Sequence, residues 1–442
     1  MLPLVSTALL TDHYELTMAR SALHAGTASR RSIFEMFGRR LPEGRRYGVV
    51  AGTGRFLEAL ADFTFGPEEI DHLAQHRVVD DATLDYLREY RFGGSIWGYA
   101  EGDVYFPGSP LLIVEGTFIE SVILETLALS IFNHDCAVAS AASRMTSAAG
   151  GRPCIEMGSR RTHEWAAVAS ARAAYLAGFA TTSNLEAGRR YGIPTAGTSA
   201  HSFTLLHDSE EDAFRAQVES LGRETTLLVD TYDVADAVER AVAIAGTNLG
   251  AVRLDSGDLV AQAHEVRAQL DALGATSTRI VVTSDLDEYA IAALAAAPVD
   301  GYGVGTSLVT GSGAPTAGLV YKLVSRADDS GTLIDVAKAS KDKASIGGRK
   351  YARRAIDENG IARGELIGIG EVPGAAEDLD LLVPLVQDGA IVGIEPVDAA
   401  RDRHRERLAQ LPRRATRLSK GEPVIPTVFV DEHPDPALFA RR

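Results

Sequence analysis

The 442-residue chain has few cysteines and no excess of basic residues. Its two thiols, Cys136 and Cys154, cannot form a disulfide framework or supply the four ligands of a structural zinc site. Any metal is therefore expected to be held by oxygen ligands or by a substrate. Acidic residues outnumber basic residues by 60 to 44, a formal net charge of −16, so we do not expect nucleic acid as the main partner.

Long apolar segments are also missing. The sequence has no uninterrupted run of about 18 apolar residues, and its first residues lack the basic region of a secretory signal before Asp12 and His13. We therefore expect a cytoplasmic protein that does not span a membrane. The composition, with 45% hydrophobic and 24% charged residues, is that of an ordinary globular protein, and the length predicts two or three domains.

Residues 1–116 change pattern over short distances, which predicts an N-terminal α+β domain. Helical spacing covers residues 11–26, 67–76 and 81–90. The expected strands are residues 31–37, 47–51, 95–100, 104–106 and 111–114, and two helical stretches follow at 117–132 and 135–149.

Residues 117–325 are expected to form an α/β domain. After Cys154, a short apolar run repeatedly ends in polar or glycine residues and is followed by an amphipathic helix, which predicts parallel strands with right-handed crossovers. A barrel is favoured, a doubly wound open sheet stays an alternative, and ligands bind at the carboxyl ends of the strands in both. The strand-like runs are residues 154–157, 193–196, 225–229, 251–254, 279–282, 299–304 and 319–324, with helices at 209–221, 234–245, 259–273 and 286–296.

Polar residues gather where these predicted strands end. Six of the seven runs are followed by arginines, carboxylates, hydroxyls or a histidine, which a barrel without a ligand would not need. The segments are GSRR (158–161), GTSAH (197–201), DTYD (230–233), RLDSGD (253–258), TSD (283–285) and GVGTS (303–307).

Two of these segments suit the binding of phosphate and of a metal. Gly303 and Gly305 would let backbone N–H groups approach a phosphate, and the Thr306 hydroxyl adds a donor, although glycines at a tight turn would look the same. Arg253 and Asp255 fall on one side of a strand, so this segment could hold an anionic substrate and reach Mg²⁺ or a ribose hydroxyl; Asp255 and Asp258 are the candidate metal ligands. The alternative is a salt bridge within the strand end.

His201 is the candidate nucleophile, because a neutral imidazole near phosphate-binding loops can act as a base or accept a phosphoryl group. A lone histidine is more often a structural residue, and Asp233 could simply cap the helix that follows it. We interpret Cys154 as a core thiol, and the run of residues 134–136 (HDC) as packing rather than a metal site.

Eight motifs in order resemble the nicotinate phosphoribosyltransferase family, the ATP-coupled type II phosphoribosyltransferases of NAD synthesis. Each motif alone is weak, but together they cover residues 9 to about 324. The motifs are LLTDHYELTM (9–18), FEMFGRRLPEGRRYGVVAG (34–52), EMGSRR (156–161), GFATTSN (178–184), GTSAHSF (197–203), VRLDSGDL (252–259), GVGTSLVT (303–310) and VYKLV (320–324).

The resemblance implies an irregular TIM-like α/β barrel at 117–325, the N-terminal α+β domain, and a small C-terminal α/β portion at 326–442 that packs near it. It implies condensation of nicotinate with 5-phosphoribosyl 1-pyrophosphate to nicotinate mononucleotide and pyrophosphate, the first step of NAD salvage, with ATP as co-substrate and Mg²⁺. It also implies a homodimer with shared active sites.

The same resemblance assigns roles to single residues. His201 matches the histidine that ATP phosphorylates, and Tyr14, with Asp12, matches the aromatic that stacks on the pyridine from the neighbouring subunit. The other matching positions are Arg160, Thr198 and Arg253 at the nicotinate and ribose-phosphate site, Asp255 at a ribose hydroxyl or metal, and Gly303, Gly305 and Thr306 at the 5′-phosphate.

One position departs from the family pattern. Met157 stands where relatives often carry an aromatic residue, and a thioether would stack more weakly on the pyridine. Ser183 stands near the place where the nicotinamide-using enzyme has an aspartate, and a neutral serine with arginines nearby suits a carboxylate. Nicotinamide phosphoribosyltransferase, quinolinate phosphoribosyltransferase and a non-catalytic ligand-binding barrel stay as alternatives.

Overall fold

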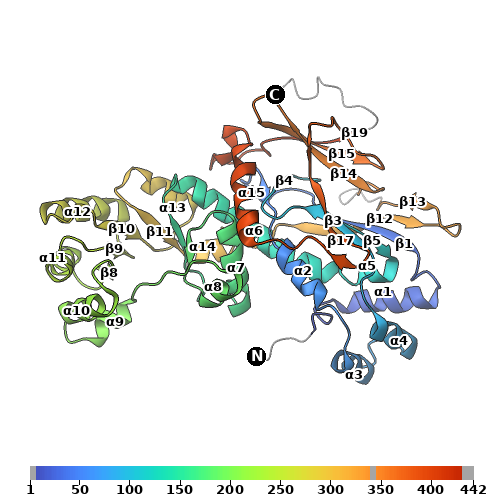
Figure 1. Ribbon diagram of the computed structural model, residues 1–442, viewed down its shortest axis with the longest axis horizontal. Coiled ribbons are helices and arrows are strands. Elements are labelled where there is room, and N and C mark those ends of the chain that lie inside the picture. Colours follow the sequence, from blue (N-terminus) through green and yellow to red (C-terminus); the bar gives the residue numbers. More distant parts are fainter. Residues whose placement is uncertain (1–5, 339–344, 431–442) are drawn as a thin grey trace. The chain divides into compact units, whose positions relative to one another are not determined.

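The structure is a computed structural model that describes residues 6–338 and 345–430. The chain divides into two compact units, drawn in Figure 1 with the chain coloured along its sequence. The first unit combines Met1–Ala137 with Thr316–Arg442, and the second unit is Val138–Pro315. The division into three domains, with boundaries at residues 116 and 325, stays a prediction.

A seven-stranded sheet forms the centre of the first unit. Its strand order is β13-β12-β1-β5-β3-β17-β18, and every neighbouring pair is antiparallel. Phe34 in the centre lies opposite Leu323 on one side and Val114 on the other. The strands are β1 (Arg31–Gly38), β3 (Ser95–Tyr99), β5 (Pro110–Thr117), β12 (Leu319–Ala327), β13 (Leu333–Asp335), β17 (Leu382–Gln387) and β18 (Ala390–Ile391).

The expectation that residues 319–324 add a parallel barrel strand is wrong. This segment is the start of β12, which pairs antiparallel with β1 in the first unit. A short apolar run has the same appearance in a buried parallel strand and in a buried antiparallel strand, so its pattern could not assign the partner.

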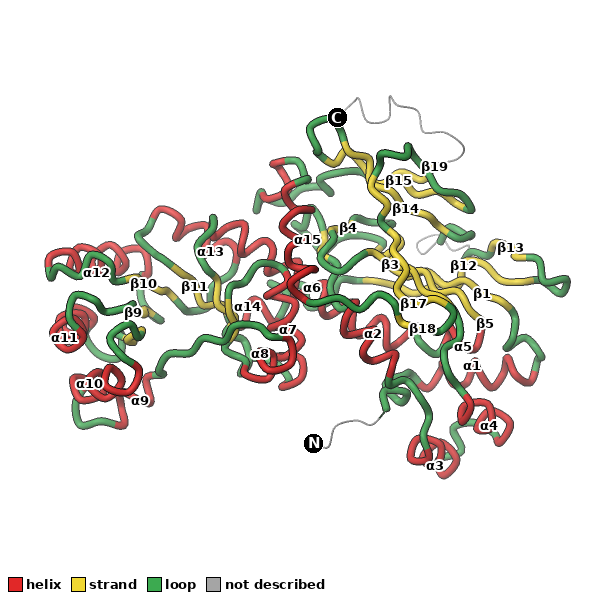
Figure 2. Tube along the Cα trace, in the orientation of Figure 1, coloured by secondary structure: helices red, strands yellow, loops and turns green. Residues whose placement is uncertain are grey.

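Helix α5 (Phe118–Val122) packs against β1 and β5, and further helices of the first unit lie around this sheet (Figure 2). Side-chain caps in the first turn explain where two of the helices begin. The Asp80 carboxylate accepts the Thr83 N–H at 3.1 Å, and Thr117 forms a capping box with Glu120. Ring stacking between Phe34 and Tyr321, with centroids 5.0 Å apart, lies in the shared core. The helices are α1 (His13–His24), α2 (Thr53–Ala61), α3 (Pro67–Gln75), α4 (Asp81–Glu89), α5 (Phe118–Val122) and α6 (Glu125–Ala149).

The segment Phe118–Ala149, which contains α5 and α6, is long and apolar enough to cross a membrane by length and composition. Its most apolar window is 67% buried inside the folded chain. A core helix passes the same test, and we assign this segment to the core.

The C-terminal segment adds a four-stranded sheet with the order β16-β14-β15-β19. Helix α15 (Val397–Ala409) lies between the third and the last of these strands in the chain. Strand β19 pairs parallel with β15, and the other pairs are antiparallel. The strands are β14 (Lys350–Ile356), β15 (Ala362–Ile369), β16 (Leu379–Asp380) and β19 (Thr427–Val430), and β2 (Gly48–Val49) pairs separately with β4 (Val104–Tyr105).

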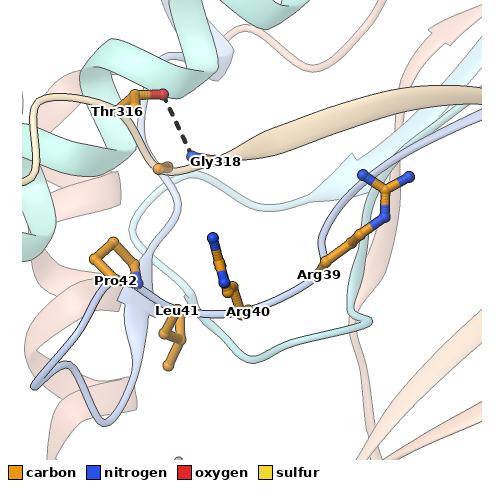
Figure 3. A pocket seen from close by; sticks show the side chains of 7 residues that line it. Arg39, Arg40, Leu41, Pro42, Thr316 and Gly318 are labelled. Atoms are coloured by element: carbon orange, nitrogen blue, oxygen red, sulfur yellow. Dashed lines mark hydrogen bonds between the residues drawn. The ribbon is translucent and has the colours of Figure 1, made fainter. Parts of the chain in front are cut away.

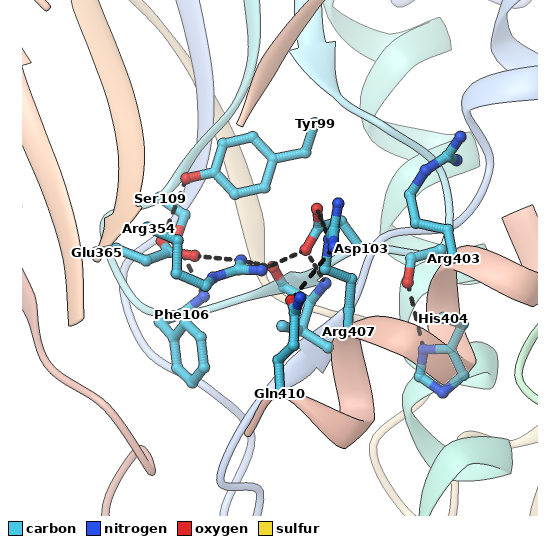
Figure 4. Close-up of polar contacts among 12 residues, drawn as sticks. Tyr99, Asp103, Phe106, Ser109, Arg354, Glu365, Arg403, His404, Arg407 and Gln410 are labelled. Atoms are coloured by element: carbon cyan, nitrogen blue, oxygen red, sulfur yellow. Dashed lines mark hydrogen bonds and ion pairs between the residues drawn. The ribbon is translucent and has the colours of Figure 1, made fainter. Parts of the chain in front are cut away.

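A buried ion network ties this segment to the N-terminal part of the first unit (Figure 4). Arg354 is 1% exposed and donates to Asp103 at 2.6 Å, to Glu365 at 2.7 Å and to the Val104 carbonyl at 2.7 Å. Glu365 also accepts the Tyr99 hydroxyl at 3.2 Å. Asp103 lies about 250 residues before Arg354, so the network joins segments that are far apart in the sequence.

The second unit contains a parallel sheet with the strand order β7-β6-β11-β10-β9-β8. Followed from β8, the strands run in chain order to β11, and β11 then pairs with β6. This order lacks the reversal of a doubly wound sheet, and β7 and β8 are the two edges of the sheet. The strands are β6 (Cys154–Glu156), β7 (Thr181–Thr182), β8 (Thr226–Leu228), β9 (Ala251–Leu254), β10 (Arg279–Val282) and β11 (Gly301–Val304).

The sheet is therefore a curled parallel half-barrel, and it is not closed within the described residues. The strand expected at 193–196 is wrong, because only an isolated bridge between Thr182 and Thr195 forms there. Pro194 and Gly197 disfavour a longer strand.

Each strand of the second unit is followed by a helix after a loop of at most seven residues, and these short loops keep their residues at the edge of the sheet (Figure 1). Side chains of Asn184, Ser209, Asp233, Asp258 and Asp287 accept hydrogen bonds from first-turn N–H groups. The helices are α7 (Glu164–Leu176), α8 (Leu185–Tyr191), α9 (His201–Leu206), α10 (Glu210–Leu221), α11 (Val234–Ala245), α12 (Leu259–Ala272), α13 (Glu288–Ala293) and α14 (Thr306–Val309).

The Arg354 network gives a prediction about stability. Replacing Arg354 with Met leaves the buried Glu365 carboxylate without a cation and leaves Asp103 paired only with Arg407, so we expect a loss of about 3–5 kcal/mol in the free energy of unfolding of the first unit. Urea unfolding measures it. The matched control is Arg353→Met on the same strand, because Asp380, the partner of Arg353, is 69% exposed and the pair should contribute about 1 kcal/mol or less. Equal losses in the two variants would contradict the prediction.

Candidate active site

His201 lies at the carboxyl edge of the parallel sheet, at the start of α9. Its Nε2 is 3.2 Å from Oδ1 of Asp230, which follows β8 and whose side chain is 2% exposed. The other oxygen of Asp230 accepts the Asp255 N–H at 2.9 Å and the Ser256 hydroxyl at 2.7 Å. Asp230 thus links the histidine to the end of the next strand.

Arg253 joins three neighbouring segments of this edge. From β9 it donates to the Thr198 hydroxyl at 3.1 Å, to the Thr283 hydroxyl at 2.9 Å and to the Asp255 carboxylate at 2.8 Å. Thr283 in turn donates to the same Asp255 oxygen. The predicted residues Thr198, Arg253 and Asp255 are therefore brought together, with Asp230 connecting them to His201.

The charge of Asp255 is favoured by these contacts. Burial alone would raise the pKa of its carboxyl, but hydrogen bonds from Thr283 and Arg253 and the charges of Arg253 and His201 outweigh burial and lower it. Both hydrogen bonds end on Oδ1 of Asp255, so Oδ2 is the oxygen suited to a metal or a ribose hydroxyl.

The glycine segment lies beside Met157. A Cβ atom on Gly303 would come within 2.5 Å of Thr283 Cγ2 and 2.7 Å of Met157 Sδ, so this position has no room for a side chain. Gly305 precedes α14, and Thr306 is its exposed first residue. Close packing thus explains Gly303, whereas Gly305 and Thr306 remain at the surface of the edge.

Arg160 and Ser183 lie on the two loops that follow β6 and β7. The Arg160 side chain is exposed and Ser183 is half-buried. The loops are joined, since the Asn184 amide donates to the Ser159 hydroxyl at 3.1 Å.

The described residues contain no group of three or more His, Cys, Asp and Glu side chains that could hold a metal ion. Asp258 accepts the Ala261 N–H at 3.1 Å as the cap of α12, so it already has a structural role. Mg²⁺ typically uses one or two carboxylates together with water and substrate phosphates. Asp255 fits a metal ion of that kind.

Other candidates have structural roles. Asp233 caps α11, as the alternative interpretation expected. Cys136 and Cys154 are buried free thiols, and burial raises the pKa of Cys154 to about 12. Asp135 pairs with Arg55 at 2.8 Å and with His134 at 2.7 Å, so the HDC run forms packing contacts.

The first unit carries Asp12 and Tyr14 at the start of α1. Tyr14 is 46% exposed; burial of part of the ring and the neighbouring carboxylates, Glu125 first among them, raise its pKa to about 12. This unit also has a cavity of about 520 Å³ with the basic side chains Arg39 and Arg40 in its wall (Figure 3).

Comparison with known proteins identifies the relatives of this chain. The sequence model of the nicotinate phosphoribosyltransferase N-terminal domain matches residues 9–133, and that of the nicotinate phosphoribosyltransferase family matches residues 153–352. The chain belongs to the nicotinate phosphoribosyltransferase family.

Relatives in this family align over almost the whole chain. Nicotinate phosphoribosyltransferase pncB1 of Mycobacterium tuberculosis is 59% identical over 429 residues, which cover 95% of this chain and 94% of the relative. Nicotinate phosphoribosyltransferase of Bacillus subtilis is 36% identical over 82% of this chain and 76% of its own.

Solved structures share the fold. The crystal structure of human nicotinic acid phosphoribosyltransferase superposes with a TM-score of 0.81 at 26% identity and covers 96% of this chain and 98% of its own. Nicotinate-nucleotide pyrophosphorylase from Pyrococcus furiosus superposes with a TM-score of 0.75 at 23% identity, covering 92% and 96%, which shows a common fold.

Sequence reasoning did not single out the residues that hold the loops of this family member in place. The Thr182 hydroxyl donates to Glu156 and accepts the Asn184 N–H, and Thr283 bridges Arg253 and Asp255. An acidic residue at the end of an apolar strand was the available signal for Glu156.

Glu15, beside Tyr14, generates a prediction about pH. It is fully buried and accepts bonds from Thr11 and Thr126; burial raises its pKa to about 7, although these bonds lower it. The folded state then keeps a proton that the unfolded state loses above about pH 4.5, so stability falls as the pH rises to about 7. We expect Glu15→Gln to unfold at higher urea at pH 8, with a gain of about 2–3 kcal/mol that disappears below about pH 4.5.

The control for this prediction is Glu89→Gln, the same change at an exposed position of α4. It should leave stability nearly unchanged at both pH values. A Glu15→Gln gain that is the same at pH 8 and pH 4 would show that the proton on Glu15 is not its cause.

Proposed function

We propose that the chain condenses nicotinate with 5-phosphoribosyl 1-pyrophosphate to nicotinate mononucleotide and pyrophosphate, coupled to ATP through a phosphohistidine. This is the first step of NAD salvage from nicotinate. The observation that carries the proposal is the hydrogen-bonded series His201, Asp230, Asp255 and Arg253 at one edge of the parallel sheet. Membership of the family supports the choice of substrates.

His201 accepts the γ-phosphoryl group of ATP in this proposal. When the Nε2–H donates to Asp230, Nδ1 carries the lone pair that attacks phosphorus. The new N–P bond replaces the P–O bond to ADP, and water later cleaves it to inorganic phosphate. The added negative charge beside Asp255 and Arg253 can order the loops that bind the phosphoribosyl donor.

Arg253, Arg160 and Asp255 act on the condensation itself. The pyridine nitrogen of nicotinate forms a bond to the anomeric carbon while the bond to the diphosphate oxygen breaks, and the diphosphate leaves with the electron pair. Arg160 and Arg253 neutralise the carboxylate and phosphate groups, and Asp255 holds a ribose hydroxyl or Mg²⁺. Mg²⁺ supplies charge neutralisation on the leaving diphosphate when it is bound with the substrate.

The remaining predicted residues take substrate-binding roles. Gly305 and Thr306, with Gly303 shaping the turn, bind the 5′-phosphate, and Thr198 contacts the ribose phosphate. Tyr14 of the partner subunit, together with Asp12, completes the pocket in a homodimer. An exposed aromatic ring at the start of α1 is suited to a contact with another chain.

The first test is phosphorylation of His201. ATP labelled at the γ-phosphate should transfer label to the wild-type protein, as an acid-labile and base-stable adduct, whereas His201→Ala should take up none because it lacks the nucleophile. Label retention on filters after base treatment measures the adduct. His264→Ala, at an exposed position of α12, is the control and should label normally. Normal labelling of His201→Ala would refute the phosphohistidine.

Selection of the carboxylate gives a second prediction. Ser183→Asp places a negative charge near the base, so kcat/KM for nicotinate should fall about 10- to 150-fold relative to nicotinamide, the range of a charge-assisted contact. Ser183→Asn, of equal size and no charge, is the control. Pyrophosphate release with each base, with and without ATP, measures the ratio. A ratio unchanged in both folded variants would place the determinant elsewhere.

A further inference from the structure

Glu156 ends strand β6 with a buried carboxylate that has no role in the proposed chemistry. The residue is 1% exposed. Oε2 accepts the Thr182 hydroxyl at 2.5 Å, and Oε1 accepts the N–H of Gly158. No arginine or lysine among the described residues forms an ion pair with Glu156, which is costly for a buried acid.

The hydrogen bonds of Glu156 lead into two loops of the candidate site. Gly158 begins the loop that carries Arg160. On the other side, the Ser183 N–H donates to the Glu156 carbonyl at 2.8 Å, and the Asn184 N–H donates to the Thr182 hydroxyl at 2.9 Å. The Asn184 bond to Ser159 closes a ring of contacts between the loops.

A third segment packs on the same ring. A Cβ atom on Gly158 would lie 2.2 Å from Val309 Cγ1, so only glycine lets this loop lie against α14. The Met157 N–H donates to the Val304 carbonyl at 2.8 Å, which fixes the loop beside the Gly305 turn. The position of Glu156 therefore affects the segments that carry Arg160, Ser183 and Thr306.

The environment of Glu156 argues against a role in stability. Burial raises the pKa of its carboxyl, and the hydrogen bonds from Thr182 and Gly158 offset this only in part. A glutamine of the same shape would avoid the cost of burying a charge. Residues that lower stability while orienting a site are typical of functional positions.

We propose that Glu156 is a positioning residue that orients the Arg160 and Ser183 loops to bind the pyridine carboxylate, an inference that rests on the proposed function. Glu156 touches neither substrate nor reacting atoms in this proposal. It acts through Gly158 and Thr182, so removing its carboxylate alters the affinity for the base rather than the phosphorylation of His201.

Steady-state kinetics of the full chain test the proposal. Glu156→Gln and Thr182→Val should raise the KM for nicotinate about tenfold, because each removes or weakens the buried hydrogen bond between the two loops. The double variant should be no worse than the single variants, since they break the same bond. Thr182→Ser keeps the hydroxyl and should behave as wild type, and label transfer from ATP to His201 should be normal in all variants.

Thr278→Val is the matched control. Thr278 is buried to the same 1% as Thr182, but its hydroxyl donates to the Leu249 carbonyl at 2.9 Å before the start of β10, the opposite end of the strands. This variant should keep the wild-type KM for nicotinate. An unchanged KM in Glu156→Gln and Thr182→Val, or an equal rise in Thr278→Val, would overturn the proposal.

Hydrogen exchange separates this proposal from the proposed function. In Glu156→Gln, the amides of Gly158, Ser183 and Asn184 should exchange faster than in wild type, and those of β9 should not change. Unchanged exchange overturns the role of Glu156 even if the wild type is active. Faster exchange with no change in nicotinate KM shows a purely structural role and also overturns it. Absence of nicotinate-dependent pyrophosphate release in wild type refutes the proposed function instead.

Discussion

The hydrogen bonds of Arg253 hold the carboxyl edge of the parallel sheet together. Asp230 and Asp255 follow neighbouring strands, and the Asp230 carboxylate accepts the backbone N–H of Asp255 at 2.9 Å, so this edge carries two acidic residues that a cation stabilises. Arg253 is 12% exposed and bonds to Asp255, to Thr283 on the next strand and to Thr198 before His201. The orientation of His201 therefore depends on a guanidinium that it does not touch, acting through the series of bonds from Asp255 to Asp230.

This edge was predictable because all strands of a βα repeat point the same way. Their ends meet at one edge, so polar residues after separate strands must converge there. Asp255 and Arg253 do meet at this edge. His201 also lies there, although residues 193–196 do not form the strand that was expected to lead to it. A single bridge at Thr195 and the following short helix α9 carry His201 to the edge.

Contacts between distant segments were not predictable from local patterns. Nothing in the apolar run at the start of β12 shows that β1 is its partner, and β7 is too short, at two residues, to give a period. In the sequence, nothing distinguishes Arg354 from the arginine beside it. Only the fold shows that Asp103 is its partner. Local pattern predicts where most elements form, whereas the partner of a buried charge depends on tertiary structure.

Buried acids in this chain differ in the groups that bond to their carboxyls. The difference depends on whether the acid lies near the candidate site. Glu365 has Arg354 beside it, and joins parts of the chain that carry no candidate site residue. Glu156 has only a hydroxyl and an N–H, beneath the loops proposed to bind nicotinate. A full negative charge there would repel a bound carboxylate, and an arginine paired with it would compete with Arg160 for that carboxylate. Burial raises the pKa of Glu156 and so makes its charged form less favourable than that of an exposed glutamate, which limits the charge added beneath the loops.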